Sequence, residues 1–192
     1  MAGPYVFEMP TALDYFGALV ADDASFALTE AAVAIAQDEA PDLDAQMVLA
    51  EIDAVAQTLK RRIPADAVPV QKLRFLNRYF FQELGFAGNV NDYYASANSY
   101  LHEVLRTRRG IPISLAVLYM ELAGQIGLAA RGVAFPGHFL VKVKMPQGEV
   151  VIDPFTGQSL SRDELDERLQ PYKRRQGLLG EFDMPLGLFL QA

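Results

Sequence analysis

The sequence predicts an α+β fold in which helices come first and a small antiparallel sheet follows. Over the first 85 residues, apolar side chains recur at spacings of three and four, which is typical of amphipathic helices. Beyond Gly127 the pattern changes to the alternation of strands, and Pro146 and Gly148 favour a tight turn between two of them. We therefore expect three units. They are a helical N-terminal region over 1–85 packed on the core, a core over 86–170 and a C-terminal tail over 171–192.

Four segments of the N-terminal region carry the helical pattern, and Pro10, Pro41 and Pro64 punctuate them. Pro41 and Asp42 look like a helix start that carries its own cap. The alanine-rich composition of the second segment favours close packing between helices. The four predicted helices cover residues 11–21, 26–40, 42–62 and 70–84.

Two more helices are predicted on either side of a glycine in the middle of the chain. A loop over 85–99, rich in glycine, asparagine and tyrosine, precedes the first of them. This short helix covers 99–109 and should stop at Gly110, after which Pro112 starts the next helix, over 112–127. Because apolar residues cover much of its circumference, we expect the helix over 112–127 at the centre of the fold.

The strand-like segments after Gly127 predict which of their side chains meet. If Lys144 pairs with Glu149 in solvent, the register sets Asp153 opposite Leu140. His138 and Asp153 then share one face of the sheet as diagonal neighbours. The predicted strands cover residues 130–135, 138–144 and 149–153.

The last predicted element is a helix that opens with a capping box. Ser161 and Glu164 have the spacing of that motif, and the helix should run toward Gln170. The residues that follow are glycine-rich and apolar, so we expect them to need a covering surface.

Composition and charge restrict the classes of function. The net charge of −7, with no basic run longer than 173–175, disfavours nucleic acid as a partner. The absence of cysteine excludes disulfides, thiolate–metal sites and a cysteine nucleophile. His102 stands beside Glu103 without a second histidine at ligand spacing, so we expect no metal and no other cofactor. Without a leader pattern or an apolar run of about 18 residues, the chain is expected to be cytoplasmic and not to enter a membrane.

Three short motifs resemble those of a known family. A helix N-terminus, a histidine at the start of a strand and an aspartate on the next strand form the skeleton of papain-like and transglutaminase-like sites. The segments RRGIPISL (108–115), FPGHFL (135–140) and IDPF (152–155) carry this pattern. Over roughly residues 25–170 the chain resembles the SirB-type branch of the transglutaminase-like superfamily, bacterial proteins usually described as regulators or left uncharacterised. The resemblance implies a transglutaminase-like (papain-like) core with a central helix packed on a small sheet.

The resemblance also implies where a nucleophile would stand. In catalytic members of the superfamily, a cysteine follows a glycine by two positions and precedes an alanine by four. Gly110, Pro112 and Ala116 keep that spacing here, so Pro112 occupies the nucleophile position. Its ring has no nucleophilic atom. We therefore interpret His138 and Asp153 as a relic catalytic pair that is structural, or that still polarises water or holds an anion.

Our leading hypothesis is a catalytically inactive domain, a pseudoenzyme, that regulates or binds another protein. One alternative is a serine hydrolase or protease-like enzyme that uses Ser114 with His138 and Asp153. A helix turns about 100° per residue, however, so Ser114 points about 200° away from Pro112. We expect its hydroxyl to bond to nearby backbone. A second alternative is a small-molecule sensor that uses the relic cleft. The oligomeric state stays open.

The loop over 88–98 and the adjacent helix end supply further candidate residues. Their polar side chains either line a cleft near His138 or satisfy the backbone of the loop itself, and we favour the second reading. Arg108 and Arg109 complement the dipole of the helix that they end. The possible cleft-lining residues are Asn89, Tyr93, Tyr94, Asn98 and Arg109.

Overall fold

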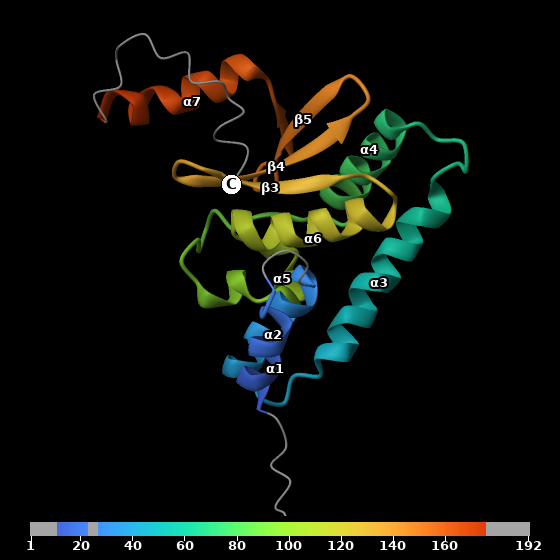
Figure 1. Cartoon of the computed structure of the whole chain (residues 1–192), viewed down its shortest axis with the longest axis vertical. Helices are drawn as coiled ribbons and strands as arrows, with labels where there is room; N and C mark the ends of the chain where they lie inside the picture. The colour runs from blue at the N-terminus through green and yellow to red at the C-terminus, as the bar shows by residue number, and fades with distance from the viewer. Residues whose placement is uncertain (1–10, 23–26, 176–192) are drawn as a thin grey trace, which may run out of the picture.

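The computed structural model describes residues 11–22 and 27–175, with side chains up to Lys173. It confirms the α+β prediction, because helices and one small antiparallel sheet occur in the predicted order. Figure 1 shows the elements in layers: helix α7 (Arg162–Arg175) lies on one side of the sheet, helix α6 (Pro112–Gln125) lies on the other, and α1, α2 and α5 lie beyond α6. The sheet is therefore enclosed between two helices.

The N-terminal helices follow the predicted pattern except at one start. The helix predicted over 42–62, with its start at Pro41 and Asp42, begins instead at Ala45, so that prediction was wrong. Asp44 is the cap, because its carboxylate accepts the backbone N–H groups of Gln46 and Met47 at 2.9 and 3.2 Å. The helices are α1 (Ala12–Leu19), α2 (Leu28–Glu39), α3 (Ala45–Arg62) and α4 (Pro69–Asn77).

A π-helix, η1 (Arg78–Glu83), continues α4, where the sequence predicted one uninterrupted α-helix. Its wider turn is visible in the hydrogen bond from the Leu84 N–H to the Tyr79 carbonyl, five residues back, at 2.8 Å. The rings of Phe80 and Phe81 both pack on Tyr119, with centroids 5.4 and 5.7 Å away. Two consecutive aromatic residues thus contact the same ring of the central helix.

The middle of the chain contains two short strands that the sequence did not reveal. The strands β1 (Ala87–Gly88) and β2 (Arg109–Gly110) pair in parallel, with Gly88 opposite Gly110. Helix α5 ends because Arg108 adopts a left-handed conformation with φ of 60°, and not at Gly110 as predicted. The short helices of this region are η2 (Ser96–Ser99) and α5 (Leu101–Thr107).

Helix α6 is the centre of the larger hydrophobic core, as its sequence predicted. The side chains of its apolar stripe are buried, and they pack against α3, α4, α5 and the near face of the sheet. The four positions of the stripe are Leu115, Leu118, Tyr119 and Leu122.

The sheet confirms the predicted register. It has four antiparallel strands in the order β3-β4-β5-β6, and Lys144 lies opposite Glu149 across the turn that pairs Met145 with Gly148. The fourth strand was not predicted. The strands are β3 (Ala130–Phe135), β4 (His138–Met145), β5 (Gly148–Asp153) and β6 (Gln158–Leu160).

The two faces of the sheet belong to two hydrophobic cores. Val141, Val143 and Ile152 join the core around α6. Leu140 and Val151, one position away along the same strands, join a smaller core with Leu165 and Leu169 of α7. Alternation along β4 and β5 therefore separates the two cores.

Helix α7 opens with the predicted capping box, since the backbone N–H and the hydroxyl of Ser161 both donate to Glu164 at 2.7 Å. It continues past Gln170 to Arg175, so 171–175, assigned above to the tail, belong to this helix. The expected cover over the apolar tail concerns 176–192 and lies outside the described residues. Within 11–22 and 27–175, no helix has the length and apolar character needed to cross a bilayer.

Candidate functional site

The sheet brings His138 and Asp153 together at one end of the hairpin. His138 is the first residue of β4 and Asp153 the last residue of β5, and the register makes them diagonal neighbours. Imidazole Nε2 lies 2.8 Å from carboxylate Oδ1. The Asp153 side chain is 2% exposed, whereas that of His138 is 23% exposed. A half-buried imidazole is thus held by a buried carboxylate.

Three donors satisfy the Asp153 carboxylate. Besides His138, the backbone N–H of Phe155 donates to Oδ1 at 3.0 Å, and Arg168 Nη1 of α7 donates to Oδ2 at 3.2 Å. Burial raises the pKa of this carboxyl, but the hydrogen bond and charge of His138, together with Phe155 and Arg168, outweigh burial and lower the pKa to about 2. Asp153 is therefore ionised at neutral pH and fully paired.

Phe155 connects this pair to the loop that leads toward α6. Its ring lies 6.2 Å from the imidazole and 5.9 Å from the ring of Tyr93, measured between centroids. Its carbonyl accepts the Gly88 N–H at 2.9 Å, and a side chain at Gly88 would overlap the Phe155 ring. Glycine at this position therefore allows the loop to lie directly against the site.

The N-terminus of α6 has no side chain joined to the pair. Pro112 is buried at the first turn of the helix. The Ser114 hydroxyl is buried, donates to the Asn98 carbonyl at 2.6 Å and accepts the Ile111 N–H at 3.2 Å. No hydrogen bond joins Ser114 to His138 in the described structure. Ser114 thus serves as a cap and a link between α6 and η2.

Two of the predicted cleft-lining residues, Asn89 and Asn98, form hydrogen bonds within the loop. The Asn89 amide donates to the Asn98 side chain at 2.9 Å. The Asn98 amide in turn donates to the carbonyls of Asp92 and Tyr93 at 2.6 and 3.0 Å. The two bonds from the Asn98 amide satisfy backbone carbonyls of the loop, and the buried Asn98 side chain gains the partners that a buried polar group requires.

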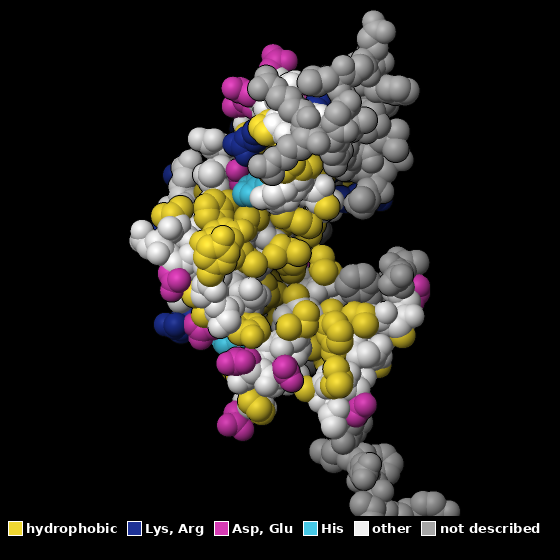
Figure 2. Space-filling model, turned by 90° about the vertical axis from the view of Figure 1, so that its left-hand side faces the viewer, with side chains coloured by type: hydrophobic (Ala, Val, Ile, Leu, Met, Phe, Trp, Pro, Cys, Tyr) yellow, Lys and Arg dark blue, Asp and Glu magenta, His cyan; other side chains and the backbone are white. Residues whose placement is uncertain are grey.

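The other side chains of this loop face outward. Val90, Tyr93 and Tyr94 are 75%, 42% and 94% exposed. Figure 2 shows hydrophobic side chains gathered on this side of the molecule, close to a histidine. Three large hydrophobic side chains of this otherwise polar loop are therefore exposed to solvent.

The arginines beyond α5 have structural contacts. Arg109 is exposed and donates to the Gly85 carbonyl at 2.7 Å and to the carbonyl of Arg108 at 2.8 Å. The Arg108 guanidinium lies 4.8 Å from the centre of the Phe86 ring. His102 lies 3.7 Å from Glu103, and its Nδ1 is buried without a hydrogen-bond partner among the residues that the structure describes.

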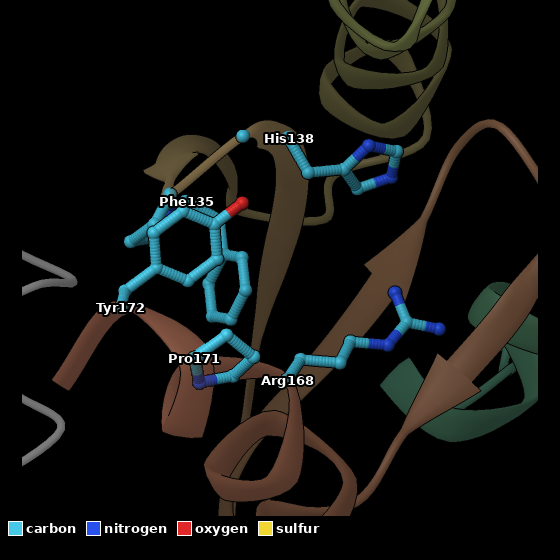
Figure 3. Close-up of a pocket in the computed structure, with 7 residues that line it drawn as sticks. Phe135, His138, Arg168, Pro171 and Tyr172 are labelled. Atoms are coloured by element: carbon cyan, nitrogen blue, oxygen red, sulfur yellow. The ribbon is translucent and has the colours of Figure 1, made fainter. Parts of the chain in front are cut away.

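A pocket with a volume of about 470 Å³ lies beside His138, between the β3–β4 turn and α7. Figure 3 shows His138 and Arg168 extending toward one end, while Phe135, Pro171 and Tyr172 lie together at the other. Arg168, Pro171 and Tyr172 of α7 were not predicted as site residues. The sequence does contain one signal for them: Arg168 and Tyr172 are four residues apart, so they share one face of the helix, beside its apolar stripe. The lining residues are Phe135, Pro136, Gly137, His138, Arg168, Pro171 and Tyr172.

Comparison with known proteins gives a family and several relatives. A family model described as transglutaminase-like superfamily matches residues 46–183. A UPF0162 protein of Xylella fastidiosa (strain 9a5c) is 41% identical over 152 residues, which are 79% of this chain and 54% of the relative. A UPF0162 protein of Vibrio cholerae is 36% identical over 107 residues, 54% of this chain and 39% of the relative. Human F-box only protein 21 is 44% identical over 72 residues, 38% of this chain and 12% of that protein.

The chain spans about half the length, 54%, of the Xylella relative that it matches. No solved structure gives a significant match.

Proposed function

We propose a function from the premise that the chain belongs to the transglutaminase-like superfamily. It is a catalytically inactive member, of the SirB-type branch, that acts in the cytoplasm as a regulatory module by binding another protein. The observation that carries the proposal is a chain without any cysteine, in which Pro112 has the spacing from Gly110 and Ala116 that the superfamily's cysteine would have. Without a nucleophile, a histidine–carboxylate pair cannot form a covalent acyl-enzyme intermediate.

The geometry of Ser114 supports inactivity. A serine nucleophile needs hydrogen-bond reach to its base, directly or through one water. The Ser114 hydroxyl instead donates to the Asn98 carbonyl at 2.6 Å, inside the contact between α6 and η2. No observation favours the serine hydrolase over the inactive module.

The exposed loop supports protein binding. The Tyr94 side chain is almost entirely exposed to solvent. The ring of Tyr93 lies beside the ring of Phe155, which in turn lies beside the imidazole of His138. Tyrosines supply large contact area at low entropic cost, which is why they are frequent at interfaces. The loop and the His138 imidazole would therefore form one surface that a partner protein would cover.

A turnover assay tests inactivity. Purified chain is incubated with glutamine-containing peptides and a primary amine, and released ammonia is measured beside the His138→Ala variant. We expect no release above the blank for either protein. Release by the wild type that the variant loses would overturn the proposal, as would fluorophosphonate labelling of the wild type that Ser114→Ala escapes.

Site-specific crosslinking tests protein binding. A photoreactive phenylalanine analogue replaces Tyr94 in cells of the source organism, and the same analogue replaces Met47, which is 67% exposed on α3, as the matched control. We expect a discrete crosslinked protein from position 94 and none from position 47. Equal crosslinking from both positions would contradict a specific surface at the loop.

A further inference from the structure

The pocket beside His138 has two chemically different ends. Phe135, Pro171 and the ring of Tyr172 form an apolar end, and the imidazole and the Arg168 guanidinium form a polar end (Figure 3). Its volume of about 470 Å³ is within the range of small-ligand sites. A ligand that fills the pocket therefore needs an apolar body and a polar head.

The polar end presents donors and positive charge. The Asp153 side chain is 2% exposed, while that of Arg168 is 38% exposed. A ligand in the pocket can therefore contact the guanidinium but not the carboxylate. The guanidinium has five N–H groups, and its hydrogen bond within the described residues is the one from Nη1 to Asp153. Further N–H groups are thus available to a ligand.

The nearby carboxylate of Glu164 does not compete for these donors by a hydrogen bond. Glu164 stands one helical turn before Arg168 on α7, and both the backbone N–H and the hydroxyl of Ser161 donate to it at 2.7 Å. These bonds lower the pKa of Glu164 and hold its carboxylate at the helix start. The carboxylates of Asp153 and Glu164 therefore both have hydrogen-bond donors of their own.

We propose that this pocket binds a carboxylate carried by an apolar group, and that its source is the C-terminal residue of a partner protein. The inference rests on the proposed binding function and names the chemistry of its ligand. The planar fork of Arg168 suits a carboxylate, since arginine and carboxylate form paired, charge-assisted hydrogen bonds. The side chain of the terminal residue lies against Phe135, Pro171 and Tyr172.

Calorimetry with a pair of matched probes tests the carboxylate. N-acetylphenylalanine and its C-terminal amide have the same apolar body and differ in charge. We expect the acid to bind at least about tenfold more tightly than the amide, because a charged hydrogen bond is lost. Equal affinity, or no binding of either probe, would overturn the inference, and this comparison needs no variant.

A pair of substitutions on the same helix tests Arg168 itself. Arg168→Gln should weaken binding of N-acetylphenylalanine about tenfold, whereas Arg162→Gln, exposed and outside the pocket, should leave it unchanged. Thermal unfolding of both variants confirms that they fold. Equal affinity of the two variants would contradict the assignment of Arg168.

The source of the carboxylate is tested with a longer probe. A four-residue peptide that ends in phenylalanine should bind at least about tenfold more tightly than N-acetylphenylalanine, because a protein chain makes further contacts outside the pocket. Equal affinity would overturn the partner protein as the source and assign the pocket to a free acid. Ammonia release in the turnover assay would instead refute the proposed function, whatever these affinities are.

Discussion

The β4–β5 hairpin and the start of helix α6 differ in the groups that they carry, because only the hairpin has the groups that catalysis would use. His138 and Asp153 of the hairpin form a connected and paired network with Arg168 of α7. At the start of α6, Pro112 offers no reactive atom and Ser114 bonds to backbone. The difference teaches that a histidine–aspartate pair can be held by its own structural contacts, because a buried carboxylate requires its donors whether or not a nucleophile is present.

The largest expected effect is on the hairpin. Asp153→Ala removes a carboxylate that is 2% exposed and leaves His138, Arg168 and the Phe155 N–H without their partner. We expect a loss of about 3 kcal/mol in the free energy of unfolding, measured by urea denaturation. Asp163→Ala, on the exposed first turn of α7, is the control and should change stability little. Equal losses in the two variants would show that the network is not structural.

The pH dependence of the same carboxylate comes next. Its pKa of about 2 in the folded protein lies below the ordinary value of 3.8, so its contribution is present above about pH 4 and is lost as the pH falls toward 2. The full contribution is about 2.5 kcal/mol, of which about 1 is lost by about pH 3.

The stability gap between wild type and Asp153→Asn should therefore narrow as the pH falls, and urea denaturation at several pH values measures it. A gap that stays constant from about pH 6 to about pH 3 would contradict the lowered pKa.

A smaller effect is expected at the helix. Ser114→Ala removes a buried hydroxyl that caps Ile111 and bonds to Asn98, and should cost about 1.5 kcal/mol in unfolding free energy. Ser96→Ala, at an exposed position of η2, is the matched control. If the Ser114→Ala variant were as stable as the wild type, Ser114 would have no structural role, and the hydrolase alternative would be strengthened.

The smallest expected effect is the most direct test of the comparison. Pro112→Cys places the chain's single thiol at the start of α6, where the helix dipole and His138 should lower its pKa by about one unit from its ordinary 8.5. The rate of iodoacetamide alkylation against pH gives this pKa. Ile113→Cys, at the 48% exposed neighbouring position, is the control. Equal pKa values for the two thiols would show that residue 112 does not stand at the nucleophile position.

Much of the sheet could be predicted because its signals are local. Alternation in β4 and β5 and a two-residue turn fix the register, and the register alone places His138 beside Asp153. The buried stripe of α6 was readable for the same reason. The start of α3 was misplaced because Pro41 resembles a helix start, although Asp44 provides the cap.

The rest of the site depends on packing that the sequence pattern does not encode. Arg168 reaches Asp153 because α7 packs on the far face of the sheet, and the capping box that predicts α7 says nothing about that face. The left-handed conformation of Arg108 was also invisible, since that conformation usually selects glycine or asparagine. Ser114 was predicted to bond to nearby backbone. Its specific partner, Asn98, lies in another element.

The π-helix over Arg78–Glu83 affects how this chain should be aligned with its homologues. A π-helical turn contains one residue more than the α-helical turn that it replaces. If a homologue has a regular helix here, the single-residue gap belongs inside 78–83 and not in the flanking loops. Moving that gap would shift the rings of Phe80 and Phe81 by one position and mismatch their contacts with Tyr119.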